Sequence, residues 1–256
     1  MEHAEVILGS LAAVDADVAA AWRSGHTGTV TMAVFPSAGR VLLPRLWARL
    51  QADPDFPQQL RIVEGEPEAA LEVLRSGQAD VVVVYSYTLA PPNVPDGCTI
   101  TRLADDPVVL ALHLDEAARR GLAQDRPVDL RDLHDAQWLL PSPPATCHEL
   151  IRQACGAAGL VPEPLAVATD FTVLTALAAA GAGIAAVPRM ALPDSTAGLS
   201  LHPLASPIIR TVSAVARIGE ARQARISKIV SGLRAVAMEH ALTSPAAMGD
   251  RRVGLD

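Results

Sequence analysis

Short apolar runs alternate with helical stretches from residue 28 onward. Three strands are predicted, at Val30–Phe35, Leu60–Val63 and Ala79–Val84. Two helices separate them, at Ser37–Leu50 and Pro67–Arg75. Four consecutive valines in the third strand indicate burial on both faces. Strands separated by helices in this way are typical of parallel βαβ units.

A second α/β set follows two strands predicted near Ile100–Leu103 and Pro107–His113. Its expected elements are a strand at Trp138–Leu140, a helix from about 143 to 158, a strand at Leu165–Ala168, a helix at Phe171–Ala180 and a strand at Gly183–Val187. Both sets end with a helix, a glycine and a buried strand, which indicates two lobes of similar design. Strands near Leu201–Leu204 and Thr211–Ala216 are expected to return the chain to the first lobe, and a helix at Ala221–Leu242 to close it.

The first 27 residues predict a long helix with a narrow apolar stripe. The stripe residues are alternately four and three positions apart: Ile7, Leu11, Val14, Val18 and Ala21. This spacing is that of a coiled-coil seam and indicates dimerisation. The alternative is an amphipathic helix that docks on its own domain. At the other end of the chain, residues 244–256 are expected to form a disordered tail.

Composition narrows the possible functions. Lys and Arg number 21 against 28 Asp and Glu, a net charge of −7, which disfavours nucleic-acid binding by this chain alone. Three Phe, three Trp and two Tyr provide no aromatic platform for stacking bases, so Ala, Val and Leu must form the core. The sequence shows no membrane-length apolar run and no secretory signal, so a cytoplasmic location is expected.

The familiar catalytic and cofactor motifs are missing or out of context. Gly181-Ala182-Gly183 matches a dinucleotide-binding pattern by its letters, but it closes a helix and opens a strand, the reverse of a phosphate-binding loop. The three cysteines are expected to be free thiols, and the histidines, which lack metal-ligand spacing, to be surface or loop residues. Asp105-Asp106 is interpreted as a turn. No catalytic residue, metal or cofactor is therefore expected.

Several predicted helices begin with short polar side chains directly after strands. Ser37 follows the first strand, Ser142 follows Trp138–Leu140, and Thr169-Asp170 follows Leu165–Ala168. In an open parallel sheet such starts gather at the carboxyl ends of the strands, where ligands bind. Free N–H groups and the helix dipole at these positions favour an anion such as a carboxylate. Plain helix capping is the alternative for each residue taken alone.

The order and spacing of several segments resemble those of LysR-type transcriptional regulators. The segments that carry the resemblance are 28–34 (GTVTMAV), 42–44 (LLP), 63–65 (VEG), 74–81 (LRSGQADV) and 178–188 (AAAGAGIAAVP). The resemblance implies an effector-binding domain of two Rossmann-like α/β lobes, of the type II periplasmic-binding-protein kind, preceded by a dimerising linker helix. Lobe I would comprise residues 28–105 and 205–243, and lobe II residues 106–204. The family's winged helix-turn-helix domain is not expected within residues 1–27.

The resemblance also implies an effector site between the lobes. By position, it would include Ser37, Ala38, Gly39, Tyr85, Ser86, Ser142, Thr146, Thr169 and Asp170. Tyr85 departs from the small residue that family members often have there, and this change would narrow or partly fill the pocket. Homodimers or tetramers are expected, with DNA bound only through the missing domain and no membrane partner.

Two other functions share this scaffold. A transporter's solute-binding protein would have the same two lobes but normally requires export. A lyase acting on a small acid would need an acid or base beside the ligand, and Asp170 is its only candidate.

Overall fold

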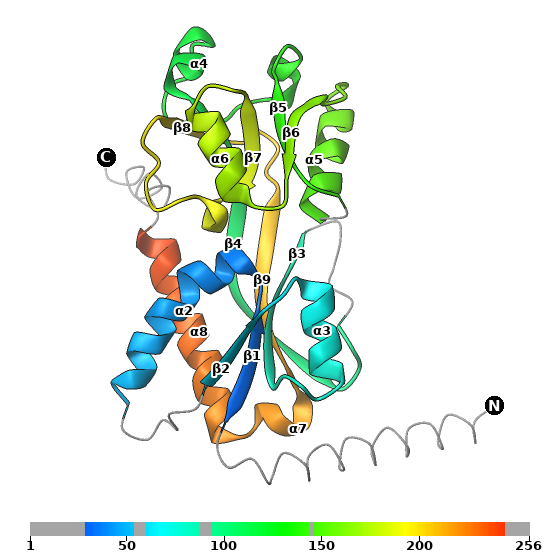
Figure 1. The fold of residues 1–256 in the computed structure, drawn as a ribbon, viewed down its shortest axis with the longest axis vertical. Helices are drawn as coiled ribbons and strands as arrows, with labels where there is room; N and C mark the ends of the chain where they lie inside the picture. Colours follow the sequence, from blue (N-terminus) through cyan, green and yellow to red (C-terminus); the bar gives the residue numbers. More distant parts are fainter. Residues whose placement is uncertain (1–28, 54–59, 88–93, 144–145, 244–256) are drawn as a thin grey trace, which may run out of the picture. The chain divides into compact units, whose positions relative to one another are not determined.

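The computed structural model describes residues 29–53, 60–87, 94–143 and 146–243 (Figure 1). These residues divide into two compact units. Unit 1 takes residues 29–53, 60–86, 94–104 and 212–243, and unit 2 takes residues 87, 105–143 and 146–211. The last crossing falls between Thr211 and Val212, seven residues beyond the expected boundary at 204/205. The predicted seam helix and the tail lie outside the described residues.

Unit 1 is built on parallel strands. Its first three strands are β1 (Val30–Val34), β2 (Leu60–Glu64) and β3 (Val81–Tyr87), with β1 paired to both neighbours. Two long strands complete the order β2-β1-β3-β9-β4, namely β4 (Cys98–His113) and β9 (Ile209–Arg217), and both continue into unit 2. The four valines of β3 are completely buried, as their apolar run predicts.

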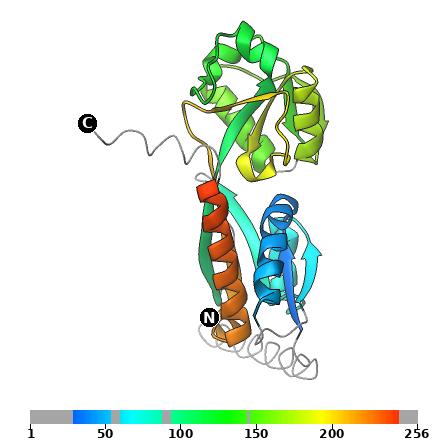
Figure 2. The same cartoon turned by 90° about the vertical axis from the view of Figure 1, so that its left-hand side faces the viewer.

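The helices of unit 1 are α2 (Pro36–Gln51), α3 (Pro67–Arg75), α7 (Ile218–Ala221) and α8 (Ala224–Thr243). The buried residues of α2 recur every fourth position: Ala38, Leu42, Leu46 and Leu50. This stripe places α2 against α8 (Figure 2). A Cβ on Gly232 of α8 would lie only 2.8 Å from the Cδ1 of Leu46. Helix α3 packs Ala70, Leu71 and Leu74 against β1 and β3.

Unit 2 has a mixed sheet. Strands β5 (Trp138–Pro141), β6 (Pro164–Ala168) and β7 (Ile184–Pro188) run parallel, while β4 pairs antiparallel with β7 and with β8 (Leu199–Pro203). The remaining elements are α4 (Leu114–Arg119), the short 3-10 helices η1 (Leu130–Leu133) and η2 (Arg189–Ala191), α5 (Thr146–Ala157) and α6 (Phe171–Ala179). Helix α6 buries Leu174 and Ala178 against Leu139, Ala185 and Val187.

Some predicted boundaries differ from the observed ones. The two strands expected near 100–103 and 107–113 are one continuous strand, β4, so Asp105 and Asp106 lie within a strand rather than a turn. The helix expected from about 143 corresponds to α5 (Thr146–Ala157), and part of its expected first turn lies outside the described residues. The closing helix is interrupted at Arg222 and Gln223, which separates α7 from α8. Among the described residues, no helix combines the length and apolarity needed to cross a membrane.

Candidate functional site

The carboxyl ends of β1 and β3 bring together five of the residues expected to bind an effector. The two strands are parallel, and Val34 pairs with Val83. The start of α2, with Ser37, Ala38 and Gly39, follows β1, whereas Tyr85 and Ser86 lie near the end of β3. Ser37, Gly39, Tyr85 and Ser86 are partly exposed and form one polar edge of unit 1, whereas the side chain of Ala38 is fully buried in the core.

Helix α2 presents an N-terminus that could bind an anion. Its N-cap is Phe35, whose apolar side chain cannot accept a capping hydrogen bond, and Pro36 occupies the first turn. Gly39 N donates to Phe35 O at 2.9 Å, which begins the helical ladder. The preceding N–H groups and the helix dipole leave a partial positive charge at this end.

Tyr85 occupies part of this polar edge. Its ring meets Phe35 edge-on, with centroids 4.9 Å apart, and its hydroxyl donates to Glu66 Oε2 at 3.0 Å. Two neighbours therefore fix the tyrosine side chain in place.

Unit 2 brings three further candidates, Ser142, Thr169 and Asp170, to one edge of its own sheet. Pro141 at the end of β5 pairs with Ala168 at the end of β6, and Ser142 N donates to Ala168 O at 2.9 Å. Thr169 follows directly and is exposed. The fourth candidate of unit 2, Thr146, begins α5 and is half-buried.

Asp170 is a helix cap. Its carboxylate accepts a hydrogen bond from Thr172 N at 2.8 Å, at the start of α6. The negative charge therefore already neutralises the N-terminus of this helix, which disfavours a second anion there. The capping alternative describes Asp170 better than a role as an anion ligand or a general acid.

A buried ion pair in unit 2 was not anticipated. Asp106 and Arg210 have side chains only 3% and 2% exposed, and Arg210 donates to Asp106 Oδ2 from Nε at 2.8 Å and from Nη2 at 2.6 Å. Met190 N donates to the other carboxylate oxygen at 2.8 Å. Burial opposes the charge on Arg210, yet Asp106 outweighs this effect and keeps the guanidinium pKa above its ordinary value. The pair connects β4 to β9.

His202 is a second residue that sequence reasoning placed wrongly, because it is fully buried on β8. Its Nδ1 lies 3.2 Å from Arg126 O and its Nε2 lies 2.8 Å from Ser200 Oγ. Since a carbonyl oxygen only accepts, Nδ1 carries the proton and Nε2 accepts from the serine. Burial lowers the pKa of His202, so the imidazole is neutral and structural.

The glycine pair after α6 is a helix stop, as its context predicts. Gly181 has a left-handed φ of 80°, Gly181 N donates to Ala178 O, and Ala182 N donates to Leu177 O. This double closure is a Schellman motif, which commonly uses glycine. The turn then enters β7, so it does not form a dinucleotide-binding loop.

The free thiols of α5 are shielded. Cys147 and Cys155 are buried, and burial raises the pKa of each thiol to about 11. Within the described ranges, no three His, Cys, Asp or Glu side chains gather in a metal-binding arrangement.

We expect slow alkylation of Cys147 and Cys155 by iodoacetamide at neutral pH, because the thiolate is the reactive form and a pKa of about 11 leaves little of it. The half-buried Cys98 is the internal reference. Peptide mass spectrometry would measure the alkylation rates. Faster labelling of Cys147 than of Cys98 would contradict the shielding.

The same thiols make the stability of the fold depend on pH. In the native protein their pKa values lie above those of the unfolded chain. The stability that the neutral thiols contribute is therefore complete below pH 9.0 and is lost as the pH rises to about 11.

The fold and the polar strand ends define a class of protein: a ligand-binding α/β protein of two units whose long strands run through both. The sequence model of the LysR substrate-binding domain matches residues 23–237, and the chain belongs to this family. It is the effector-sensing domain of a LysR-type regulator, and family membership favours this function over the solute-binding and lyase alternatives.

Solved structures share this fold. An OxyR mutant of Corynebacterium glutamicum with bound H₂O₂ is 23% identical, with a TM-score of 0.67 over 97% of this chain and 77% of that chain. A full-length BenM mutant is 23% identical, with a TM-score of 0.70 over 95% and 78% of the two chains. The BenM effector-binding domain with benzoate is 24% identical, with a TM-score of 0.66 over 86% and 96%. Comparison with curated protein sequences produces no significant match.

Proposed function

We propose that the effector of this domain is a small anionic metabolite, bound by hydrogen-bond donors that lie at the ends of strands. The N-terminus of α2 is the observation that carries the proposal. This helix of 16 residues begins directly after β1, and its N-cap side chain supplies no negative charge. A carboxylate would accept hydrogen bonds from the N–H groups of the first turn and would interact favourably with the helix dipole.

The other donors surround this helix start or lie on unit 2. Ser37 provides a hydroxyl within the first turn of α2, and Ser86 provides one near the end of β3. In unit 2 the proposal assigns hydroxyl contacts to Ser142, Thr146 and Thr169. Benzoate, which the BenM domain holds in its structure, is a carboxylate of the proposed class. Tyr85 would limit the size of the effector.

Asp170 is not among the residues that we propose to bind the anionic effector. Its carboxylate accepts from Thr172 N and is exposed, so we propose that it stabilises α6. It would have no acid–base role. We also propose that the domain itself is not an enzyme.

Replacing Ser37 with Asp should separate ligand binding from folding. A carboxylate in the first turn of α2 is favourable for the helix dipole, by about 0.3–1 kcal/mol, so thermal stability should hold or rise. The same charge would repel an anionic effector and weaken carboxylate binding by at least about tenfold. Calorimetric titration with benzoate and a panel of aliphatic dicarboxylates would measure the affinity.

Ser227→Asp is the matched control. Ser227 is an exposed serine in the first turn of α8, and the variant adds the same charge at a different helix of unit 1. It should bind the carboxylates like the parent protein. Equal affinity in both variants, or no carboxylate binding by the parent, would refute the proposed anion site.

The regulatory output is also a proposal. Effector binding would be relayed to a DNA-binding domain of the same regulator, and the ligand can shift that equilibrium only by its differential affinity for two conformations. The gene sequence immediately upstream of residue 1 tests this arrangement, since a helix-turn-helix encoded there would support it. We propose that the protein acts in the cytoplasm.

We further propose a homodimer, or a tetramer built from dimers, in which Ile7, Leu11, Val14, Val18 and Ala21 form a seam. Two edge strands offer additional apolar surface. Leu165 and Val167 on β6 are 57% and 47% exposed, and Ile62 on β2 is 41% exposed. Exposed apolar side chains on edge strands are common at interfaces between subunits.

A further inference from the structure

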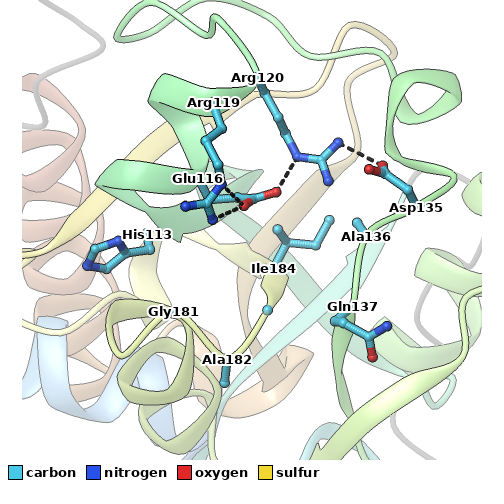
Figure 3. A pocket seen from close by; sticks show the side chains of 11 residues that line it. His113, Glu116, Arg119, Arg120, Asp135, Ala136, Gln137, Gly181, Ala182 and Ile184 are labelled. Atoms are coloured by element: carbon cyan, nitrogen blue, oxygen red, sulfur yellow. Dashed lines mark hydrogen bonds and ion pairs between the residues drawn. The ribbon is translucent and has the colours of Figure 1, made fainter.

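We propose that unit 2 has a second ligand site, which binds a small oxyanion in the hollow shown in Figure 3. The hollow has a volume of about 400 Å³ and is lined by residues from three segments, 113–120, 135–137 and 181–184. The inference does not depend on the proposed effector site, because all of these residues belong to unit 2.

The hollow lies at the opposite end of the unit 2 strands from the candidate effector residues of the same unit. Strands β5 and β7 are parallel, and their first residues, Trp138 and Ile184, pair beside it. Ser142 and Thr169 instead follow the carboxyl ends of β5 and β6. A ligand in the hollow would therefore occupy a separate site.

A charged cluster on and beside α4 forms one wall. Glu116 accepts from Arg120 Nε at 2.6 Å through one carboxylate oxygen and from Arg119 Nε at 3.1 Å through the other. Two guanidinium groups thus face one carboxylate, and Asp135, which pairs with Arg120, balances the second positive charge. An anion in the hollow would therefore be bound by charge-assisted hydrogen bonds from the guanidinium groups rather than by an excess of positive charge.

Arg120 is held so that part of its guanidinium remains available. The side chain is 16% exposed, and its Nη1 donates to Asp135 Oδ1 at 2.9 Å and to Asp132 O at 3.2 Å. These bonds and the one to Glu116 use Nε and Nη1, and Nη2 is directed into the hollow (Figure 3). Asp135 lies at the rim, 62% exposed, where solvent screens its charge.

The other walls add donors and space. His113 Nδ1 accepts from Asp115 N at 3.1 Å, so the neutral ring carries its proton on Nε2. Gln137 is exposed at the mouth and has a side-chain amide. The Gly181–Gly183 turn has little side-chain bulk, which allows a ligand to approach the backbone. Guanidinium and amide donors around a polar hollow suit a phosphate or carboxylate group.

An NMR titration of the full 256-residue chain with inorganic phosphate, at ionic strength matched with sodium chloride, tests the site. Saturable amide shifts confined to the three lining segments are expected at millimolar phosphate. A parallel titration with acetate distinguishes a tetrahedral from a planar oxyanion, and saturable binding of either supports the proposal. Shifts that do not saturate, or that spread over the surface, would overturn it.

Two variants test whether the side chains that line the hollow bind the oxyanion. Arg119→Gln removes a guanidinium whose side chain is 69% exposed, so the fold should persist while affinity falls about tenfold, the loss expected for one charge-assisted hydrogen bond. Gln137→Glu adds a carboxylate at the mouth without changing side-chain size and should weaken binding by a similar factor. Gln78→Glu, at an exposed position of unit 1, is the charge-matched control. Unchanged affinity in both hollow variants would refute the site.

The same titration separates this site from the proposed effector site. Ser37→Asp in unit 1 should leave the phosphate shifts of unit 2 unchanged. Loss of these shifts in Ser37→Asp would mean that phosphate binds at the α2 N-terminus, which would overturn the second site. Failure of carboxylate binding at unit 1 alone would refute the effector proposal and leave the hollow intact.

Discussion

Asp106→Asn is expected to reduce the free energy of unfolding by about 3–5 kcal/mol, the usual cost of leaving one member of a buried ion pair without its partner. The Arg210 guanidinium would remain in an interior where its side chain is 2% exposed, and Met190 N would lose a charged acceptor. Urea denaturation followed by circular dichroism would measure the change, with the slope of the transition serving as a check on two-state unfolding.

Two comparisons show whether burial causes the effect. Arg131→Met breaks an exposed ion pair with Asp129 in the same unit and should leave the denaturation midpoint unchanged. The double variant Asp106→Leu/Arg210→Met removes both charges and should recover much of the loss, although Met190 N remains unpaired at a cost of about 1–3 kcal/mol. If Asp106→Asn were as stable as the parent protein, the result would show that water reaches this pair.

Gly183→Ala is expected to destabilise unit 2 by about 3 kcal/mol, at the upper end of the range for overpacking. A Cβ at this position would lie 2.6 Å from Gln137 O and 3.2 Å from Gln137 C. These are backbone atoms, and Gln137 O also accepts from Ile184 N at 2.8 Å where β7 begins beside β5. The clash can therefore be relieved only by moving the strand start.

Gly156→Ala is the control for this substitution. Gly156 lies within α5, and an added Cβ would meet nothing within 4 Å. Alanine there should stabilise the helix by about 0.5–1 kcal/mol. Thermal unfolding of the two variants should therefore shift in opposite directions, and a neutral Gly183→Ala would contradict the close approach of the chain to Gln137 O.

Local patterns in the chain were sufficient for most of the elements. The helix at Pro67–Arg75 was predicted with its observed bounds, because proline suits a first turn and the glycine at 77 follows its end. The break predicted near Asp105 and Asp106 was wrong, since two adjacent carboxylates resemble a turn in sequence. A partner 104 residues away stabilises Asp106 inside a strand, and local pattern contains no sign of that partner.

For the candidate site, too, some features could be predicted from the sequence and others could not. Ser37 and Ser142 follow strands in the sequence, so their places at the strand ends could be predicted from the order of elements. The role of Asp170 could not be decided in that way, because a cap and a ligand have the same sequence signature. The hydrogen bond from Thr172 N identifies the cap.

The sequence by itself determined the two α/β sets, the apolar faces of their helices and the family, because these depend on periodicity and on the order of short segments. The tertiary structure decided which polar groups are buried and what they contact. The Asp106–Arg210 pair, the contact of His202 with Arg126 O and the approach of Gly183 to Gln137 all join residues distant in the chain, and such contacts depend on how the elements pack.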